Sequence, residues 1–343
     1  MNSRALAAVT SCVMLAALGC GGGAAPAKTT TPPLPPLHLQ PVADLAPAAG
    51  LTWLVDTKPR TFFAHPEMVI AVRALFPDVK FETFTQRHGG VDLRQLDDLV
   101  IAAYPKAMLF LGHGLLDPQK IETAFAARAS VEGRGLDRQS SDPLGNIVRT
   151  WGTVTLTSER EQIAIFGREA LALESGRFGP VRAATLFAEG RLKKASPALK
   201  AAPLARASEV LGTAELRAFA PGPFEGEWAH ALGGLLAAST AIGVSATFAP
   251  GSTDEGGQLA FRVVVMGAWK DDAPAAATRL SAAIDTLAAS AIGRLCGFDK
   301  PSAGPTVRAT DDALIADFTV RALPIFRGLK AATGASIDEV MSY

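Results

Sequence analysis

The sequence predicts an α+β protein with antiparallel sheets covered by helices, and three observations lead to this expectation. The chain has 343 residues, of which 48% are hydrophobic, so it can fill one or two cores of the usual size. Alternating apolar positions predict strands, whereas apolar positions three and four residues apart predict helices. The same order of such segments occurs twice along the chain, which suggests an internal repeat.

Each copy is predicted as strand, helix, strand, strand and helix. In the first copy these elements are expected at 81–85, 91–98, 99–104, 107–111 and from 117 to about 128. In the second copy they are expected at 215–220, 225–240, 244–248, 259–266 and from 272 to about 291. Asp117 and Asp272 each follow a glycine by five residues, and we expect them to cap the amides of the last helix.

Closing strands expected at 146–156 and 313–320 would complete a ferredoxin-like order in both copies. The expected fold is therefore two ferredoxin-like β-α-β-β-α(-β) units after a disordered N-terminal tether. A hairpin meander is predicted between the units, with strands at 147–151, 154–156, 162–166 and 170–174. Helices at 180–194 and 197–211 are expected to bridge to the second unit, and Gly212 to end the latter helix.

The first residues predict an export signal. Arg4 provides a positive charge, residues 5–18 form a short apolar stretch, and small residues precede Cys20. As a helix this stretch would cover only about 21 Å, which is short of the ~30 Å hydrocarbon core of a bilayer. We therefore expect a cleaved signal rather than a transmembrane anchor.

The segment Ala17-Leu18-Gly19-Cys20 resembles the lipobox of bacterial lipoproteins, although Ala17 stands where leucine is commoner. The resemblance implies cleavage between Gly19 and Cys20, diacylglycerol on the Cys20 sulfur and a third acyl chain on its amine. Two or more chains hold a protein stably on a membrane. Gly21 follows the cysteine, which by resemblance to enteric lipoproteins favours the outer membrane over the inner. The alternative is an ordinary secretory signal with an incidental cysteine.

The expected organisation therefore has four segments. The signal peptide covers 1–19, and the lipidated cysteine with a Gly-, Pro- and Ala-rich tether covers 20–50. Glycine frees such a chain and proline extends it. The first α+β unit with its meander covers 51–176, and the second unit with its bridging helices covers 177–343.

Three features of the body resemble uncharacterised lipoproteins of myxobacteria and related secreted families. They are Val91-Asp92, the glycine-to-aspartate helix starts and the segment 167–172. The resemblance covers much of 51–341. It implies the fold and a location in the cell envelope, but no substrate, because those relatives have no assigned activity.

Motifs for catalysis or metal binding are absent from the sequence, which has no Gly-x-Ser-x-Gly, Cys-x-x-Cys, His-Glu-x-x-His or Walker loop. We therefore predict no catalytic residue, no metal site and no cofactor. Lys plus Arg and Asp plus Glu both total 33, which argues against binding of nucleic acid. Cys296, the one cysteine after Cys20, is interpreted as a small buried hydrophobe.

Three residues are candidates for contact with a ligand or partner. His113 lies at the carboxyl end of a predicted strand, where sheet proteins often place sites. Trp228 and Trp269 are large amphipathic residues of a kind that is enriched in contact patches. The plainer interpretation is a loop histidine and two core tryptophans.

These observations favour a non-enzymatic binding or envelope-assembly module, held on the membrane through the Cys20 lipid, with an envelope protein as candidate partner. One alternative is an enzyme whose site is assembled from distant residues around His113. Another is a structural component that recognises other copies of itself. A cavity that joins His113 to two acidic or nucleophilic side chains would favour the enzyme, and an apolar surface would favour the binding module.

Overall fold

The computed structural model describes residues 36–130, 136–140, 146–154, 160–176, 179–249 and 257–331. Its strands are β1 (Trp53–Thr57), β2 (Asp98–Tyr104), β3 (Ala107–His113), β4 (Ala129–Ser130), β5 (Asp137–Ser140), β6 (Ile147–Val154), β7 (Arg160–Phe166), β8 (Ala170–Gly176), β9 (Leu216–Pro221), β10 (Ser239–Ala249), β11 (Gln258–Gly267), β12 (Ala303–Ala309) and β13 (Ala313–Arg321).

The helices include short 3-10 turns, which are labelled η. They are η1 (Val42–Leu45), α1 (Pro59–Ala64), α2 (Pro66–Leu75), α3 (Asp78–Arg87), η2 (Leu93–Gln95), α4 (Pro118–Arg128), α5 (Pro180–Ala188), η3 (Ala198–Lys200), α6 (Leu204–Leu211), α7 (Glu227–His230), η4 (Ala231–Ala238), η6 (Lys270–Asp272), α8 (Ala273–Ala289) and α9 (Ala291–Leu295). A further helix covers 322–331. Over the described ranges, no helix combines the length and the apolar character that crossing a bilayer requires.

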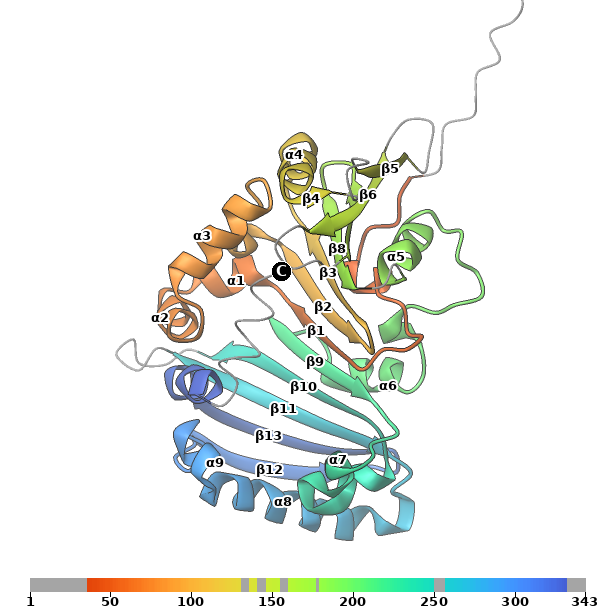
Figure 1. The fold of residues 1–343 in the computed structure, drawn as a ribbon. Helices are drawn as coiled ribbons and strands as arrows, with labels where there is room; N and C mark the ends of the chain where they lie inside the picture. Colours follow the sequence, from red (N-terminus) through yellow and green to blue (C-terminus); the bar gives the residue numbers. More distant parts are fainter. Residues whose placement is uncertain are drawn as a thin grey trace, which may run out of the picture. The chain divides into compact units, whose positions relative to one another are not determined.

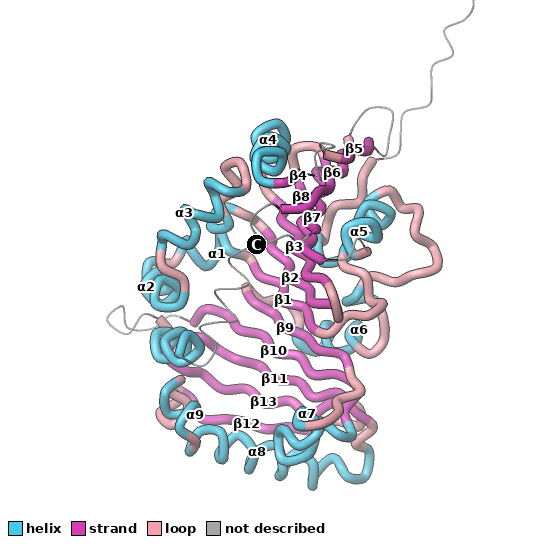
Figure 2. Tube along the Cα trace, viewed as in Figure 1, coloured by secondary structure: helices cyan, strands magenta, loops and turns pink. Residues whose placement is uncertain are grey.

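The strands form one antiparallel sheet, so the expected α+β class is confirmed, but the two expected sheets are continuous (Figures 1 and 2). The order of strands is β12-β13-β11-β10-β9-β1-β2-β3-β8-β7-β6-β4, and β5 pairs with β6. The two halves meet where β1 pairs with β9, with Val55 opposite Ala218. This pairing joins segments about 160 residues apart in the chain.

The two halves have the same pairing order. The first runs β1-β2-β3-β8-β7 and the second runs β9-β10-β11-β13-β12. In each half the first strand pairs directly with the second strand, whereas a ferredoxin-like unit separates two parallel strands by a third. The expected ferredoxin-like order is therefore not observed, because the helical connections after β1 and after β9 each return the chain antiparallel to the neighbouring position. The predicted closing strand at 313–320 does lie beside β11, but in the first half this place is taken by β8 rather than by 146–156.

Several predicted elements are confirmed and others differ. The strands expected separately at 147–151 and 154–156 meet in the single strand β6, and the helix expected at 197–211 is divided into η3 and α6. The predicted strands at 99–104, 107–111 and 259–266 correspond to β2, β3 and β11. The segment 81–85 is part of helix α3, where Phe81 and Phe84 use helical spacing to bury their rings. The helix expected over 91–98 is reduced to the short turn η2, and that expected over 225–240 is broken by left-handed backbone at 232–234.

The predicted helix caps have different outcomes. Asp117 accepts a hydrogen bond from the Lys120 amide at the start of α4, as expected for an N-cap. Asp272 precedes α8 but makes no capping hydrogen bond with its side chain. Gly212 follows α6 with a φ of 71°, the left-handed conformation that glycine adopts at helix ends.

Helices cover both faces of the sheet, and alternation along the strands separates these faces. On the face we call the α5 face, α5, α6, η1 and η3 pack on residues such as Leu54 and Val100. On the opposite face, which we call the α1 face, Phe84 and Phe125 pack on the first half. Leu280 of α8 packs on the second half. Full burial of one such side chain contributes about 1.5–3 kcal/mol.

The N-terminal segment 36–50 differs from the expected tether. Val42 and Leu45 are 2% and 1% exposed and pack in the core of the α5 face. The His38 amide donates to the Ala188 carbonyl at 2.8 Å, and the Ala48 amide donates to the Ser196 carbonyl at 3.0 Å. Within the described residues, therefore, the chain belongs to the folded body from Pro36 onward.

Candidate functional site

A pocket lined with phenylalanine lies between helices α1–α3 and the α1 face of the sheet. Its volume is about 220 Å³; fifteen of the described residues line it, and Thr57 is the one polar residue among them. Seven of these residues are phenylalanines, namely Phe62, Phe63, Phe76, Phe81, Phe84, Phe110 and Phe326. A cavity with so little hydrogen-bonding capacity suits an apolar ligand group.

Four separate parts of the chain build the pocket: 55–84, 93–110, Leu216 and Phe326. Helices α1 to α3 and the residue after α2 contribute Phe62, Phe63, Phe76, Phe81 and Phe84, and Phe63 meets Phe81 edge to face with ring centroids 5.5 Å apart. Strands β1, β2, β3 and β9 form the floor, and the helix at 322–331 contributes Phe326. About half of the lining residues are partly exposed, so the pocket is open at its surface end.

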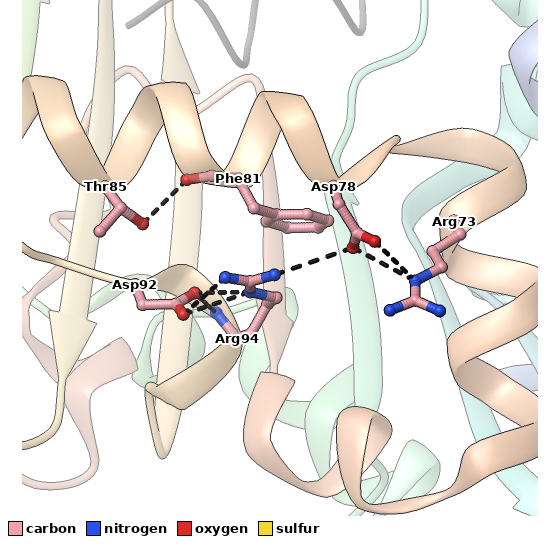
Figure 3. Close-up of polar contacts among 6 residues, drawn as sticks. All are labelled: Arg73, Asp78, Phe81, Thr85, Asp92 and Arg94. Atoms are coloured by element: carbon pink, nitrogen blue, oxygen red, sulfur yellow. Dashed lines mark hydrogen bonds and ion pairs between the residues drawn. The ribbon is translucent and has the colours of Figure 1, made fainter.

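Charged side chains hold the outer wall of this pocket (Figure 3). The Arg94 guanidinium lies 5.5 Å from the centroid of the Phe81 ring. Its Nε and Nη2 each donate to the Asp92 carboxylate at 2.9 Å, and its Nη1 lies 3.7 Å from Asp78. Arg73 Nε lies 2.9 Å from Asp78, which connects α2 with the start of α3. The network therefore fixes the Phe81 side of the pocket to η2.

The ionisation of Asp92 is consistent with this role. Burial raises the pKa of Asp92, but its hydrogen bonds with Arg94 have the larger combined effect, and the pKa lies below its usual value. Asp92 is therefore charged at neutral pH and keeps Arg94 in place over Phe81.

A second, polar cleft lies on the other side of η2. Its volume is about 360 Å³, and Asp92, Asp117, Lys120 and Arg168 are among its lining residues. Val91-Asp92, the first of the two glycine-to-aspartate helix starts and Arg168 of the segment 167–172 therefore meet in this cleft. Asp92 and Asp117 already accept hydrogen bonds from Arg94 and from the Lys120 amide, so both carboxylates have structural partners.

His113 lies at the end of β3 on the α5 face. Its Nε2 is 2.7 Å from the Gln40 amide nitrogen, and its Nδ1 is 3.7 Å and 3.8 Å from carboxylate oxygens of Asp98 and Asp97. Burial raises the pKa of Asp98. Two acidic groups thus approach His113, but it lines neither cavity described above. The contact with Gln40 ties the N-terminal segment to the sheet.

The other candidate residues have contrasting environments. Trp228 on α7 is 70% exposed, whereas Trp269 is 4% exposed and donates from Nε1 to the Val265 carbonyl. Trp269 is therefore a core residue. Cys296 is buried, and burial raises the pKa of its thiol. Gly19 and Cys20 lie outside the described residues.

The phenylalanine pocket is not among the sites predicted from the sequence. Five of its seven phenylalanines lie between positions 62 and 84, although the whole chain has only 17. This local density was the available signal. Among the described residues, no group of His, Cys, Asp and Glu side chains is arranged to hold a metal ion.

Comparison with known proteins supplies no assignment: no family model, no curated protein and no solved structure matches this chain. The two cavities and the chemistry of their residues are therefore the features that bear on function.

Proposed function

We propose that this protein is a bacterial lipoprotein of the cell envelope whose body is a non-enzymatic binding module for an apolar ligand. The phenylalanine pocket carries the proposal. An apolar cavity of about 150 Å³ in another protein stays dry and binds benzene, and the present pocket is larger, at about 220 Å³. A ring or a hydrocarbon segment bound in the pocket would displace water from the partly exposed apolar residues that line it.

The lining supports binding rather than catalysis. General acid–base chemistry needs a titratable group within hydrogen-bond reach of the reacting atoms. Among the described lining residues Thr57 is the one polar residue, and the charged groups of the wall, Asp92 and Arg94, are bound to each other. A group placed in this pocket would therefore be held by its apolar surface.

The membrane part of the proposal rests on the first twenty residues. Lipid on Cys20 would hold the protein on a membrane, with the outer membrane favoured, and an envelope protein remains the candidate partner. The segment up to Pro36 would link this lipid to the folded body.

Filling the pocket should abolish binding of a neutral apolar probe. Leu216 is half-buried and lines the pocket, so Leu216→Trp is expected to weaken N-phenyl-1-naphthylamine binding at least about tenfold, or ~1.4 kcal/mol. Leu216→Met conserves the volume and should bind as the unaltered protein does. The measurement is titration calorimetry on the full chain carrying Cys20→Ser. Equal affinity of the Leu216→Trp and unaltered proteins would contradict the proposed site.

Removing the lipid-bearing sulfur should release the protein from membranes. The N-terminal peptide of the mature protein is expected to carry three acyl chains by mass spectrometry, and the protein should sediment with membranes. Cys20→Ser should lose both properties, whereas Cys12→Ser is the matched control and should keep both. Membrane association of the Cys20→Ser protein at the level of the control would rule out this anchor.

A further inference from the structure

The phenylalanine pocket adjoins a partly exposed apolar strip in the middle of the α1 face. Five residues directly opposite one another on adjacent strands form this strip, which we call the central row. They are Ile101 of β2, Val55 of β1, Ala218 of β9, Val244 of β10 and Val263 of β11. All five are only half-buried.

Helices bound the central row at both ends. Beyond Ile101 the next residue in register is Phe110, which is 5% exposed in the core under α1–α4. Beyond Val263 the next is Ala316, which is 0% exposed in the core under α8. The row therefore forms a partly exposed apolar strip between these two cores, which we call the trough. With strands about 4.8 Å apart, its four spacings cover about 19 Å.

The trough and the pocket are continuous, because Val55 and Ile101 belong to both. Over the described parts of β1, β2, β9, β10 and β11, the side chains on the α1 face carry no charge. An uncharged ligand matches this surface, whereas a charged group placed there would lose its hydration without gaining a partner.

The backbone of the trough excludes an extended peptide. Each of its five strands is paired on both sides, so their amides and carbonyls are already used in the sheet. A peptide adds to a sheet only at an exposed edge. Laid across the central row, it would leave its own N–H and C=O groups without partners, which costs about 1–3 kcal/mol for each buried group. A hydrocarbon chain has no such groups to satisfy.

We propose that the ligand is the hydrocarbon chain of a lipid, which lies across the central row with one end in the phenylalanine pocket. This inference rests on the proposed function, since it assigns a ligand class to the same pocket. The trough extends from the pocket across four strand spacings, and this extent favours a chain over a compact ring system. The polar end of the lipid would remain outside the uncharged strip.

Affinity should then depend on chain length. Burial of each added CH2 group is expected to strengthen binding by up to about fourfold. For 1-alkanols from six to twelve carbons, the gain should continue after the pocket is full, because further carbons lie on the central row. Competition with N-phenyl-1-naphthylamine on the full chain carrying Cys20→Ser measures the series.

Two substitutions separate the trough from the pocket. Ala218→Glu places a charge on the central row outside the pocket lining, and it should remove most of the gain with chain length while binding of the naphthylamine probe is retained. Ala218→Phe should do the same by bulk if the charged variant does not fold. Thr247→Glu is the control, since Thr247 is exposed on the α5 face of neighbouring β10.

The results distinguish the two proposals. A steady gain with chain length that Ala218→Glu or Ala218→Phe removes supports the lipid chain. A plateau at short alkanols with probe binding intact overturns the trough and leaves the pocket. Absence of all binding overturns the proposed function itself. Dimers that dissociate when alkanol is added, or higher affinity after deletion of 332–343, would assign the trough to a second copy or to this chain and overturn the lipid ligand.

Discussion

Substitution of Arg128 by Met is expected to lower the free energy of unfolding by about 3 kcal/mol, because it leaves Glu161 buried without its main partner. Arg128 Nη2 and Nε lie 3.0 Å and 3.3 Å from Glu161 Oε2, and the two side chains are 13% and 10% exposed. Arg128 Nη1 also donates to the Arg87 carbonyl at 2.9 Å. The substitution therefore removes both the charge partner and a bond between α4 and the end of α3.

The expected cost is at the lower end of the range for broken buried pairs, which is about 3–5 kcal/mol. Arg87 also lies 3.6 Å from Glu161 and would keep part of the compensation. Burial lowers the pKa of Arg128, and the pairing with Glu161 opposes that shift. The charge of Arg128 is therefore stabilised mainly by Glu161, because little water reaches it. Urea denaturation of the folded protein at pH 7 measures the change.

Two further variants are compared with Arg128→Met. Arg138→Met breaks an exposed pair with Glu122 and should cost less than about 1 kcal/mol. The double variant Arg128→Met with Glu161→Gln removes both charges and should regain part of the loss. If Arg128→Met and Arg138→Met were equally destabilising, the buried pair would not have the importance assigned to it.

Local sequence patterns predict those strands and helices whose conformation follows from their own residues. Strand β11 contains a long apolar run, β10 alternates apolar residues with small and hydroxyl-bearing ones, and α8 presents Ala276 and Leu280 at helical spacing. The segment Phe81-Glu82-Thr83-Phe84-Thr85 was misassigned as a strand, because its aromatic and β-branched residues favour strands. Phe81 and Phe84 instead bury their rings from one side of α3, so tertiary packing overrides the local preference.

The continuous sheet and the pocket depend on pairings that local patterns do not contain. Val55 and Ala218 lie opposite each other only after the two halves have joined. Phe326 reaches the same pocket as Phe62 from the other end of the chain. His113 was correctly placed at the end of a strand, but its contact with Gln40 required the fold of a segment that was expected to be a tether.

Glu174 makes the stability of the protein depend on pH in an unusual direction. Its carboxylate is 2% exposed, and it accepts hydrogen bonds at 2.9 Å from the amides of Gly179 and Val181 at the start of α5. Burial raises the pKa of Glu174 from 4.5 to about 7, although these amides and Arg149 act in the opposite direction. Between these two pH values the folded protein holds a proton that the unfolded chain has released.

The contribution of Glu174 to stability therefore falls as pH rises from about 4.5 to about 7, by up to ~3 kcal/mol. It is fully present below the unfolded pKa and is lost as the pH passes the folded pKa. Glu174→Gln cannot ionise and keeps only one acceptor oxygen for the two amides, which costs the variant a constant amount at every pH. Relative to the unaltered protein, its free energy of unfolding should therefore rise by up to ~3 kcal/mol between pH 4.5 and pH 8. Urea denaturation of both proteins between pH 4.5 and 8 isolates the effect, since other titrating groups are shared. Parallel stability curves would mean that Glu174 ionises as readily in the folded state as in the unfolded chain, and that the amides of α5 fully replace the water lost on burial.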